Sequence, residues 1–190
     1  MNAEPISAAT TAAPARALPR LRASALDLAV VAGWAVFAAA AGVVARAFDY
    51  DFASPTSADI FAFVTLVGPV VLTFAFQEAS SRKATFGKRR LGLQVTDRSG
   101  RRLSLARSLT RSIVKFLPWQ LAHTAVIGLF DDSTNSMLIV AAIGAQALVL
   151  ASVIAMAVDP YHRSFHDWLA GTRVVAEEHS RRSTTEGGST

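Results

Sequence analysis

The sequence predicts a mainly α-helical membrane protein. It has four transmembrane helices, a small cytoplasmic β-hairpin of two or three strands, and an interfacial amphipathic helix. Two observations lead to this class. Of the 190 residues, 52% are hydrophobic and only 17% are charged, whereas an ordinary soluble domain has about 25% charged residues. The apolar residues also lie in long blocks, not in the short amphipathic pieces that a soluble fold needs.

Four apolar blocks supply the predicted spans, because a helix that crosses the hydrocarbon needs about 20 mostly apolar residues. The blocks cover residues 24–45, 60–77, 113–130 and 137–158. The uninterrupted part of the third block, 116–130, is short for a span and contains Pro118, Gln120 and His123. It therefore either crosses the membrane as a short span or enters and returns.

Basic residues set the predicted orientation, because Lys and Arg stay on the cytoplasmic side of a membrane. Most of the 19 Lys and Arg residues precede the first span, separate the second from the third, or follow the fourth. The other two connections together hold only Arg46. Both termini are therefore expected in the cytoplasm, with an even number of crossings of the plasma (inner) membrane. The polar tails 1–18 and 177–190 are predicted to be disordered around one membrane domain, 19–176.

The long connection between the second and third spans predicts β-structure. Residues 91–95 alternate apolar with polar or small side chains, a turn follows at 97–100, and 103–105 resume the alternation. This period of two is typical of half-buried strands. An isolated two-stranded hairpin is marginal in water. We therefore expect 172–176, the remaining stretch with strand character, to pair with it as a third strand.

An amphipathic helix is predicted over residues 105–115. Its basic side chains Arg107, Arg111 and Lys115 are four residues apart and share one face, opposite an apolar face. This pattern favours a helix in the headgroup plane that contacts anionic lipid headgroups. Nucleic acid is not an expected partner, because the aromatic interleaving of a single-strand binder is missing.

Three sequence blocks carry a resemblance to a known family. They read RLRASALD at 20–27, TFGKRRLGLQV at 85–95 and HDWLAGT at 166–172. In this order and spacing they resemble the RDD family of small membrane proteins, with its motifs R-x-x-A-x-x-x-D, T-x-G-K-R-x-x-G-x-x-V and H-D-x-x-A-G-T. The resemblance implies a multi-pass membrane protein for which ligand or ion transport is suggested. It carries the family's named arginine and two aspartates onto Arg20, Asp27 and Asp167.

Asp27 is the most informative residue, because an ionisable group in a spanning helix normally faces a partner or a water cavity. Arg20 lies two turns earlier on nearly the same face. Two interpretations stay open. Either Asp27 binds an ion or a proton under the control of Arg20, or it only tethers the first span to a basic cytoplasmic residue. His123 either joins Asp27 in a proton relay or bonds to a packed helix. Asp167 is expected to lock the cytoplasmic part through arginines.

No enzyme and no cofactor are predicted. His162 and His166 are four residues apart, so a helix that begins near Asp159 would place both on one side, close to two aspartates. Zinc needs a third and usually a fourth ligand, so the two histidines are weak candidates for a metal site. The sequence contains no nucleotide-binding loop, no metalloprotease histidine pair and no serine elbow. The absence of cysteine also excludes a disulfide scaffold and a cysteine nucleophile.

Two functions remain. The first is transport of a small ion or solute with an intramembrane aspartate. Four helices are few to enclose a pathway, so a homo-oligomer or a membrane partner protein is expected. The alternative is a non-transporting membrane interaction or assembly module that uses its basic cytoplasmic loop.

Overall fold

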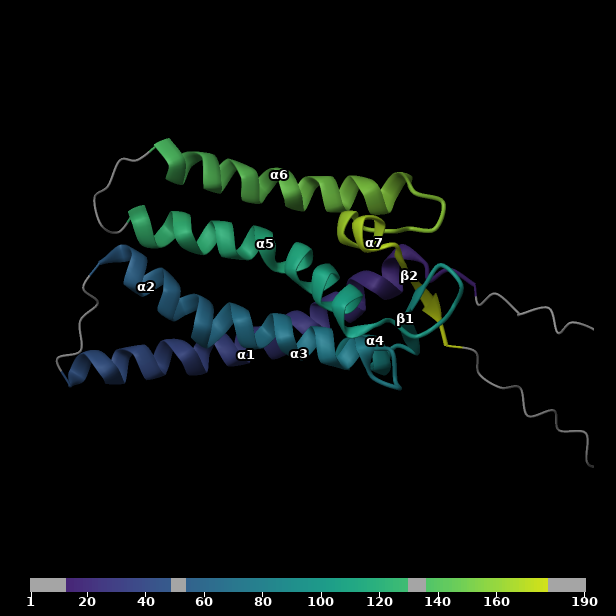
Figure 1. The fold of residues 1–190 in the computed structure, drawn as a ribbon, viewed down its shortest axis with the longest axis horizontal. Helices are drawn as coiled ribbons and strands as arrows, with labels where there is room; N and C mark the ends of the chain where they lie inside the picture. Colours follow the sequence, from purple (N-terminus) through teal and green to yellow (C-terminus); the bar gives the residue numbers. More distant parts are fainter. Residues whose placement is uncertain (1–12, 49–53, 130–135, 178–190) are drawn as a thin grey trace, which may run out of the picture.

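The computed structural model describes residues 13–48, 54–129 and 136–177. Long helices lie side by side, and a small mixed unit closes one end of them (Figure 1). The elements are, in order, α1 (Ala17–Ala47), α2 (Pro55–Ala62), the π-helix η1 (Phe63–Val67), α3 (Gly68–Ala79), α4 (Phe86–Arg90), β1 (Leu93–Asp97), α5 (Leu105–Leu129), α6 (Ser136–Val158), α7 (Phe165–Ala170) and β2 (Thr172–Ala176).

Three described helices are long and apolar enough to cross a membrane. They are Ala17–Ala47, the continuous helical segment Thr56–Ala79, and Ser136–Val158. Each contains one predicted span, namely 24–45, 60–77 and 137–158. The mainly helical class is therefore confirmed, and these three helices are candidate membrane spans.

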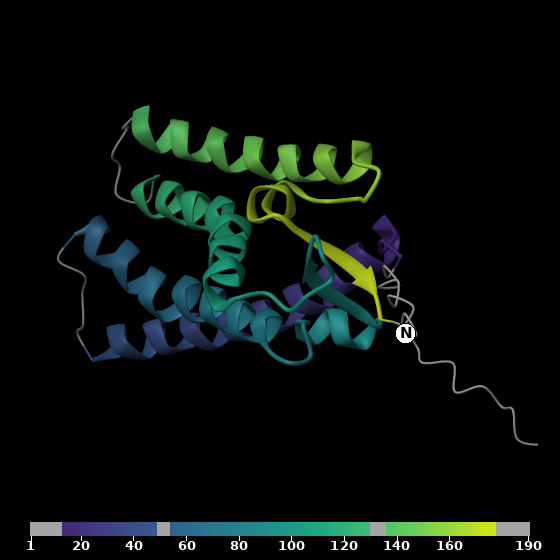
Figure 2. The ribbon, with the colours of Figure 1, turned by 45° about the vertical axis from the view of Figure 1, so that its right-hand side comes forward.

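Helix α5 combines two segments that the sequence analysis treats separately. The predicted surface helix 105–115 and the predicted third span 113–130 form one continuous helix, Leu105–Leu129; residue 130 lies outside the described residues. Its direction changes along its length (Figure 2), and Pro118 within it explains a bend because proline lacks a backbone N–H. Helix α5 lies along α6, but it is not one of the three helices that are long and apolar enough to cross a membrane.

An apolar core holds α1, α3 and α5 together. Val31 of α1, Val70 and Phe74 of α3, and Phe116 of α5 belong to one buried cluster. The rings of Phe74 and Phe116 meet edge to face, with centroids 4.9 Å apart. Close approach of α5 to α3 depends on a small residue, because the buried Ser108 hydroxyl donates to the Ala75 carbonyl oxygen at 2.9 Å.

The sheet has two antiparallel strands. Leu93 of β1 lies opposite Ala176 of β2, and Asp97 opposite Thr172. The predicted pairing of 172–176 is therefore confirmed, whereas the predicted hairpin strand 103–105 is wrong. The reason is local. Asp97 accepts the backbone N–H of Ser99 and of Arg101, which closes a tight turn, and the chain then enters α5 at Leu105.

The N-terminal segment 13–15 lies along the other edge of β2. Pro14 bridges to Val175, and the Ala15 N–H donates to the Val174 carbonyl oxygen at 3.0 Å. Residues 13–18, which the sequence places in a disordered tail, are thus part of the fold. The rest of the predicted tails, 1–12 and 178–190, lies outside the described residues. This bridge brings both described ends of the chain to the same end of the molecule (Figure 1).

We call α4, β1, α7 and β2, together with residues 13–15, the cap. Its interior is a small apolar cluster that includes Ala15, Ala23, Val95, Leu103 and Val174. The cap lies against the end of the helices where α1 begins and α3 ends (Figure 1). This junction positions the candidate site.

Candidate functional site

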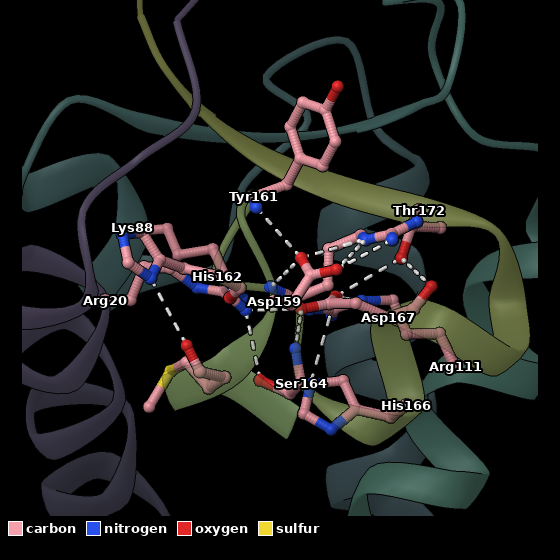
Figure 3. A network of polar contacts seen from close by, with 12 residues as sticks. Arg20, Lys88, Arg111, Asp159, Tyr161, His162, Ser164, His166, Asp167 and Thr172 are labelled. Atoms are coloured by element: carbon pink, nitrogen blue, oxygen red, sulfur yellow. Dashed lines mark hydrogen bonds and ion pairs between the residues drawn. The ribbon is translucent and has the colours of Figure 1, made fainter. Parts of the chain in front are cut away.

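A buried ionic network joins the cap to the long helices, and Figure 3 shows the part of it around Asp167. We use this name for five residues, each from a different helix: Arg20 (α1), Glu78 (α3), Lys88 (α4), Arg111 (α5) and Asp167 (α7). Each of these side chains is at most 8% exposed. Segments far apart in the sequence are therefore held together by charge in a largely dry place, where ion pairs are strong only if well formed.

Asp167 is the centre of the network. One carboxylate oxygen accepts from Arg111, whose Nε is 2.8 Å away and whose Nη2 is 2.7 Å away, and also from the Thr172 hydroxyl at 3.2 Å. The other accepts from Arg20 and from the Ser164 N–H at 3.1 Å. Burial opposes the charged form, but the guanidinium groups of Arg111 and Arg20 hold the pKa of Asp167 well below its usual range. The sequence prediction placed Asp167 beside arginines of the loop, and Arg111 is one of them.

Glu78 is the second buried carboxylate, and the sequence analysis did not single it out. Its Oε1 lies 2.6 Å from the Lys88 Nζ, and its Oε2 accepts from Arg111. Arg111 therefore bridges Glu78 and Asp167, which are far apart in the sequence. Glu78 directly follows the second apolar block, and an acid at the end of such a block is a signal that could have identified it.

Asp27 is bound to neutral donors. Its Oδ2 accepts from the Thr85 hydroxyl at 2.6 Å, and its Oδ1 accepts from the Gly87 N–H at 2.7 Å. Arg20 turns away from Asp27 and bonds to Asp167, Ser164 and the carbonyl oxygen of His162. Asp27 thus tethers the first span to the connection after the second, but through a hydroxyl and an amide in place of the expected basic residue.

Gly87 permits the contact between α4 and α1. A Cβ at this position would lie 2.1 Å from the carbonyl oxygen of Ala23 and 3.0 Å from an Asp27 carboxylate oxygen. Only glycine therefore allows the Gly87 amide to reach Asp27. The central sequence block has a physical explanation, since Thr85 and Gly87 bind Asp27 while the next residue, Lys88, binds Glu78.

His123 is not connected to Asp27. Its Nδ1 accepts from the Trp119 Nε1 at 2.9 Å, one turn earlier on α5. The contacts of the described residues thus contain no relay between His123 and Asp27. Asp27 has Thr85 and Gly87 as partners instead.

The two C-terminal histidines do not share a helix face, so that expectation is wrong. His162 has a positive φ of 52°, and α7 begins only at Phe165. The N-cap of α7 is Ser164, in place of the expected start near Asp159. In the part of the chain that the structure describes, no group of three or more His, Cys, Asp or Glu side chains is placed to hold a metal ion.

His166 lies beside the network. Its Nε2 is 3.9 Å from an Asp167 carboxylate oxygen. Burial lowers the pKa of His166 to about 3, Asp167 opposes this change, and the positive charges of Arg111 and Lys115 add to it. His166 is therefore neutral at neutral pH.

The predicted basic face of α5 is directed mainly inward, which corrects the expectation of a lipid-facing stripe. Arg107 is exposed, with Nη1 3.8 Å from an Asp97 carboxylate oxygen, but Arg111 is buried in the network. The Lys115 Nζ lies over the rings of Phe74 and Phe116, 4.3 and 5.3 Å from their centroids. Buried carboxylates on α3 and α7 draw Arg111 away from the surface.

Comparison with known proteins gave one family match. The model of the RDD family matches residues 14–171, which is most of the chain and includes every residue of the ionic network. Neither the curated proteins nor the solved structures gave a match.

Proposed function

This chain belongs to the RDD family, and we propose that this membrane protein moves a small ion or solute, with the ionic network as a gate at the cap end. One observation carries the proposal. Five ionisable side chains from five helices are buried where the long helices meet the cap. Ionisable groups within membrane helices are costly and often mark an ion or solute pathway.

The network is suited to a gate because its bonds lie between elements and not within them. Arg20–Asp167 joins α1 to α7, Arg111–Asp167 joins α5 to α7, and Arg111–Glu78 joins α5 to α3. A charged or polar solute that competes for one of these partners weakens the contact between two helices. Exchange of ion-pair partners is a way to couple binding to helix movement.

In this proposal the role of Asp27 is to position the residues around the start of α4. It holds Thr85 and Gly87, and thereby Lys88, against α1. The Lys88 Nζ lies 3.5 Å from the Thr85 hydroxyl as well as 2.6 Å from Glu78. A change in the charge of Asp27 therefore reaches the network through α4.

The proposal includes four crossings of the plasma membrane, with α5 as the fourth and the cap in the cytoplasm. The bridge between Pro14 and Val175 supports an even number of crossings because both described ends lie at one end of the molecule. It also includes a homo-oligomer. Within the most apolar windows of α1 and α6 only 6% of the residues are buried, so both helices present wide faces to lipid or to another subunit.

A flux assay tests transport directly. The full chain is reconstituted into vesicles and assayed against a panel of small ions and solutes, beside Asp27→Asn and the matched control Glu177→Gln, an exposed acid at the edge of the sheet. We expect flux with the unchanged protein and the control, and at least a ten-fold loss per folded protein with Asp27→Asn. Transport is contradicted if the unchanged protein moves nothing in the panel, or if Asp27→Asn lowers only the amount of protein.

A second candidate function is an assembly module that recruits a partner through its basic loop. It is favoured by the exposed arginines between α3 and the first turn of α5, which are Arg82, Arg89, Arg90, Arg98, Arg101, Arg102 and Arg107. They suit an acidic partner surface. This function predicts no flux, together with a bound protein that is released when these arginines are changed to glutamine.

A further inference from the structure

A small cavity lies beside the ionic network. It has a volume of about 100 Å³ and is bounded by residues of α1, α5, α6 and the start of α7. Four cations line it, Arg20, Lys88, Arg111 and Lys115. No carboxylate is among its lining residues in the described part of the chain. The cavity is therefore positively charged on its inner surface.

Lys115 is the cation whose charge the network does not balance. Arg20, Lys88 and Arg111 each contact Asp167 or Glu78. Lys115 has ring contacts with Phe74 and Phe116, and among the described residues it has no hydrogen bond or ion pair. Aromatic faces attract a cation but carry no net charge to neutralise it.

Counting the nearby acids gives the same result. Glu78 and Asp167 pair with the network cations, Asp27 bonds to Thr85 and Gly87, and His166 is neutral. None of these groups forms an ion pair with Lys115. Burial disfavours the charged form of a lysine that has no partner, so an anionic ligand in the cavity would stabilise the charged form of Lys115.

The location of the cavity indicates the source of that charge. Its wall includes Leu21 of α1 and Val153 of α6, which are 51% and 52% exposed. Both lie on helices long and apolar enough to cross a membrane, at the ends of these helices that meet the cap. Because α1 packs mainly on α4 and α6 mainly on α5 and α7, the cavity reaches the lipid-facing surface between α1 and α6.

We propose that this cavity binds the phosphate group of an anionic phospholipid. Arg20, Lys115 and the hydroxyls of Ser24 and Ser152 supply donors for the phosphate oxygens. The acyl chains follow the apolar surface beside Leu21 and Val153. A zwitterionic lipid brings its own positive charge and does not balance Lys115, so the site selects anionic headgroups.

The test uses the full chain in mild detergent, with phosphatidylglycerol and phosphatidylcholine of identical acyl chains as probes. Native mass spectrometry and thermal unfolding measure binding. We expect one retained phosphatidylglycerol per protomer and a higher Tm, with weaker retention of phosphatidylcholine. Lys115→Gln should weaken phosphatidylglycerol binding about ten-fold. Arg107→Gln, an exposed charge two turns earlier on the same helix, should leave it unchanged.

A second variant keeps the test informative if Lys115→Gln fails to fold. Ser152→Leu fills the cavity from α6, and Ser152 forms no hydrogen bond with the ionic network in the described part of the chain, so the substitution should block lipid binding while leaving Tm in phosphatidylcholine unchanged. Three results overturn the site. These are equal binding of both lipids, an equal loss with Arg107→Gln, or undiminished phosphatidylglycerol binding by Ser152→Leu. Stabilisation by sodium phosphate equal to that by phosphatidylglycerol overturns the lipid as the ligand.

Discussion

Asp27 and Asp167 are both buried aspartates of the sequence motifs, yet they bind different kinds of donor. Asp167 receives two guanidinium groups, whereas Asp27 receives a hydroxyl and a backbone amide. Removing the charge therefore has different consequences. At Asp167 it leaves Arg20 without a carboxylate partner and Arg111 with Glu78 alone, while at Asp27 it leaves only neutral donors to be satisfied.

The first prediction concerns these two carboxylates. Asp167→Asn should lower the free energy of unfolding by about 3–5 kcal/mol, because it breaks a buried ion pair. Asp27→Asn should cost about 1–3 kcal/mol, because its amide oxygen still accepts one of the two hydrogen bonds. Denaturant unfolding in detergent measures both. Equal effects of the two substitutions would show that the guanidinium groups are not what stabilises this junction.

Gly87 gives the second prediction. Its missing Cβ leaves room for the Ala23 carbonyl oxygen, so Gly87→Ala should push α4 away from α1 and destabilise the protein by about 1–3 kcal/mol or more. Gly33→Ala is the matched control, because nothing lies within 4 Å of its Cβ position and alanine favours a helix. Thermal unfolding measures both, and a neutral Gly87→Ala would contradict the close approach.

His166 gives a pH dependence. Its pKa is about 3 in the fold and about 6.5 in the unfolded chain, so the unfolded state binds the proton more readily. The free energy of unfolding should therefore fall as pH is lowered from about 6.5 towards 3, by up to about 1.4 kcal/mol per pH unit. The lowered pKa of Asp167 adds to this loss only below about pH 4.

The measurement is thermal unfolding in detergent between pH 7 and pH 4. His166→Asn should remove most of the slope, whereas His162→Asn, at a position with positive φ that asparagine tolerates, should keep it. An unchanged slope in His166→Asn would show that another group binds the proton.

At the scale of elements, sequence periodicity predicted the long helices and strand β2. It missed features that depend on a single contact between distant segments. The apolar blocks in α1, in the continuous segment from α2 to α3, and in α6 are long enough to predict spanning helices, and the β-branched pair in Thr172–Ala176 favoured a strand. Leu103 and Leu105 are too short a run to distinguish a strand from the entry to a helix. The basic face of α5 was read from spacing alone, but the carboxylates that bury Arg111 come from Glu78 and Asp167.

The candidate site was predictable to a similar extent. Arg20, Asp27 and Asp167 were identified through motif resemblance, but their partners were not, because Arg20 and Asp167 are 147 residues apart in the chain. No local pattern encodes such a contact. The pairing of Asp27 with Thr85 and Gly87 joins two motifs in the same way, and only the packing of α4 on α1 reveals it.

The register of the sheet provides a prediction at this scale. Leu93 lies opposite Ala176, and the neighbouring Glu177 N–H donates to the Gly92 carbonyl oxygen, so Leu93 and Ala176 form the narrow, non-hydrogen-bonded type of pair. Cysteines at these two positions should form a disulfide readily, since the chain contains no cysteine. Cysteines at Leu93 and Val174, two residues out of register, should not. Gel mobility with and without reductant distinguishes the two.

At the scale of the whole molecule, the two ends of the helices are held together differently. The cap end has the five-residue ionic network, whereas the far end has the lighter contact of Asp59 with Gln120 and Thr124. The exposed arginines also gather at the cap end. Because Lys and Arg remain on the cytoplasmic side, this asymmetry predicts a cytoplasmic cap.

Single-cysteine labelling tests this orientation. Arg98→Cys lies on the cap in the turn after β1, and Ser54→Cys lies at the opposite end, just before α2; both positions are exposed. With an impermeant maleimide on intact cells, Ser54→Cys should be labelled and Arg98→Cys should react only after permeabilisation. The pair also tests the number of crossings, because the two sites lie on opposite sides only if α2–α3 spans the membrane. External labelling of Arg98→Cys would place the cap, the ionic network and the lipid site at the outer leaflet, and the positive charge of the cap would then need another explanation.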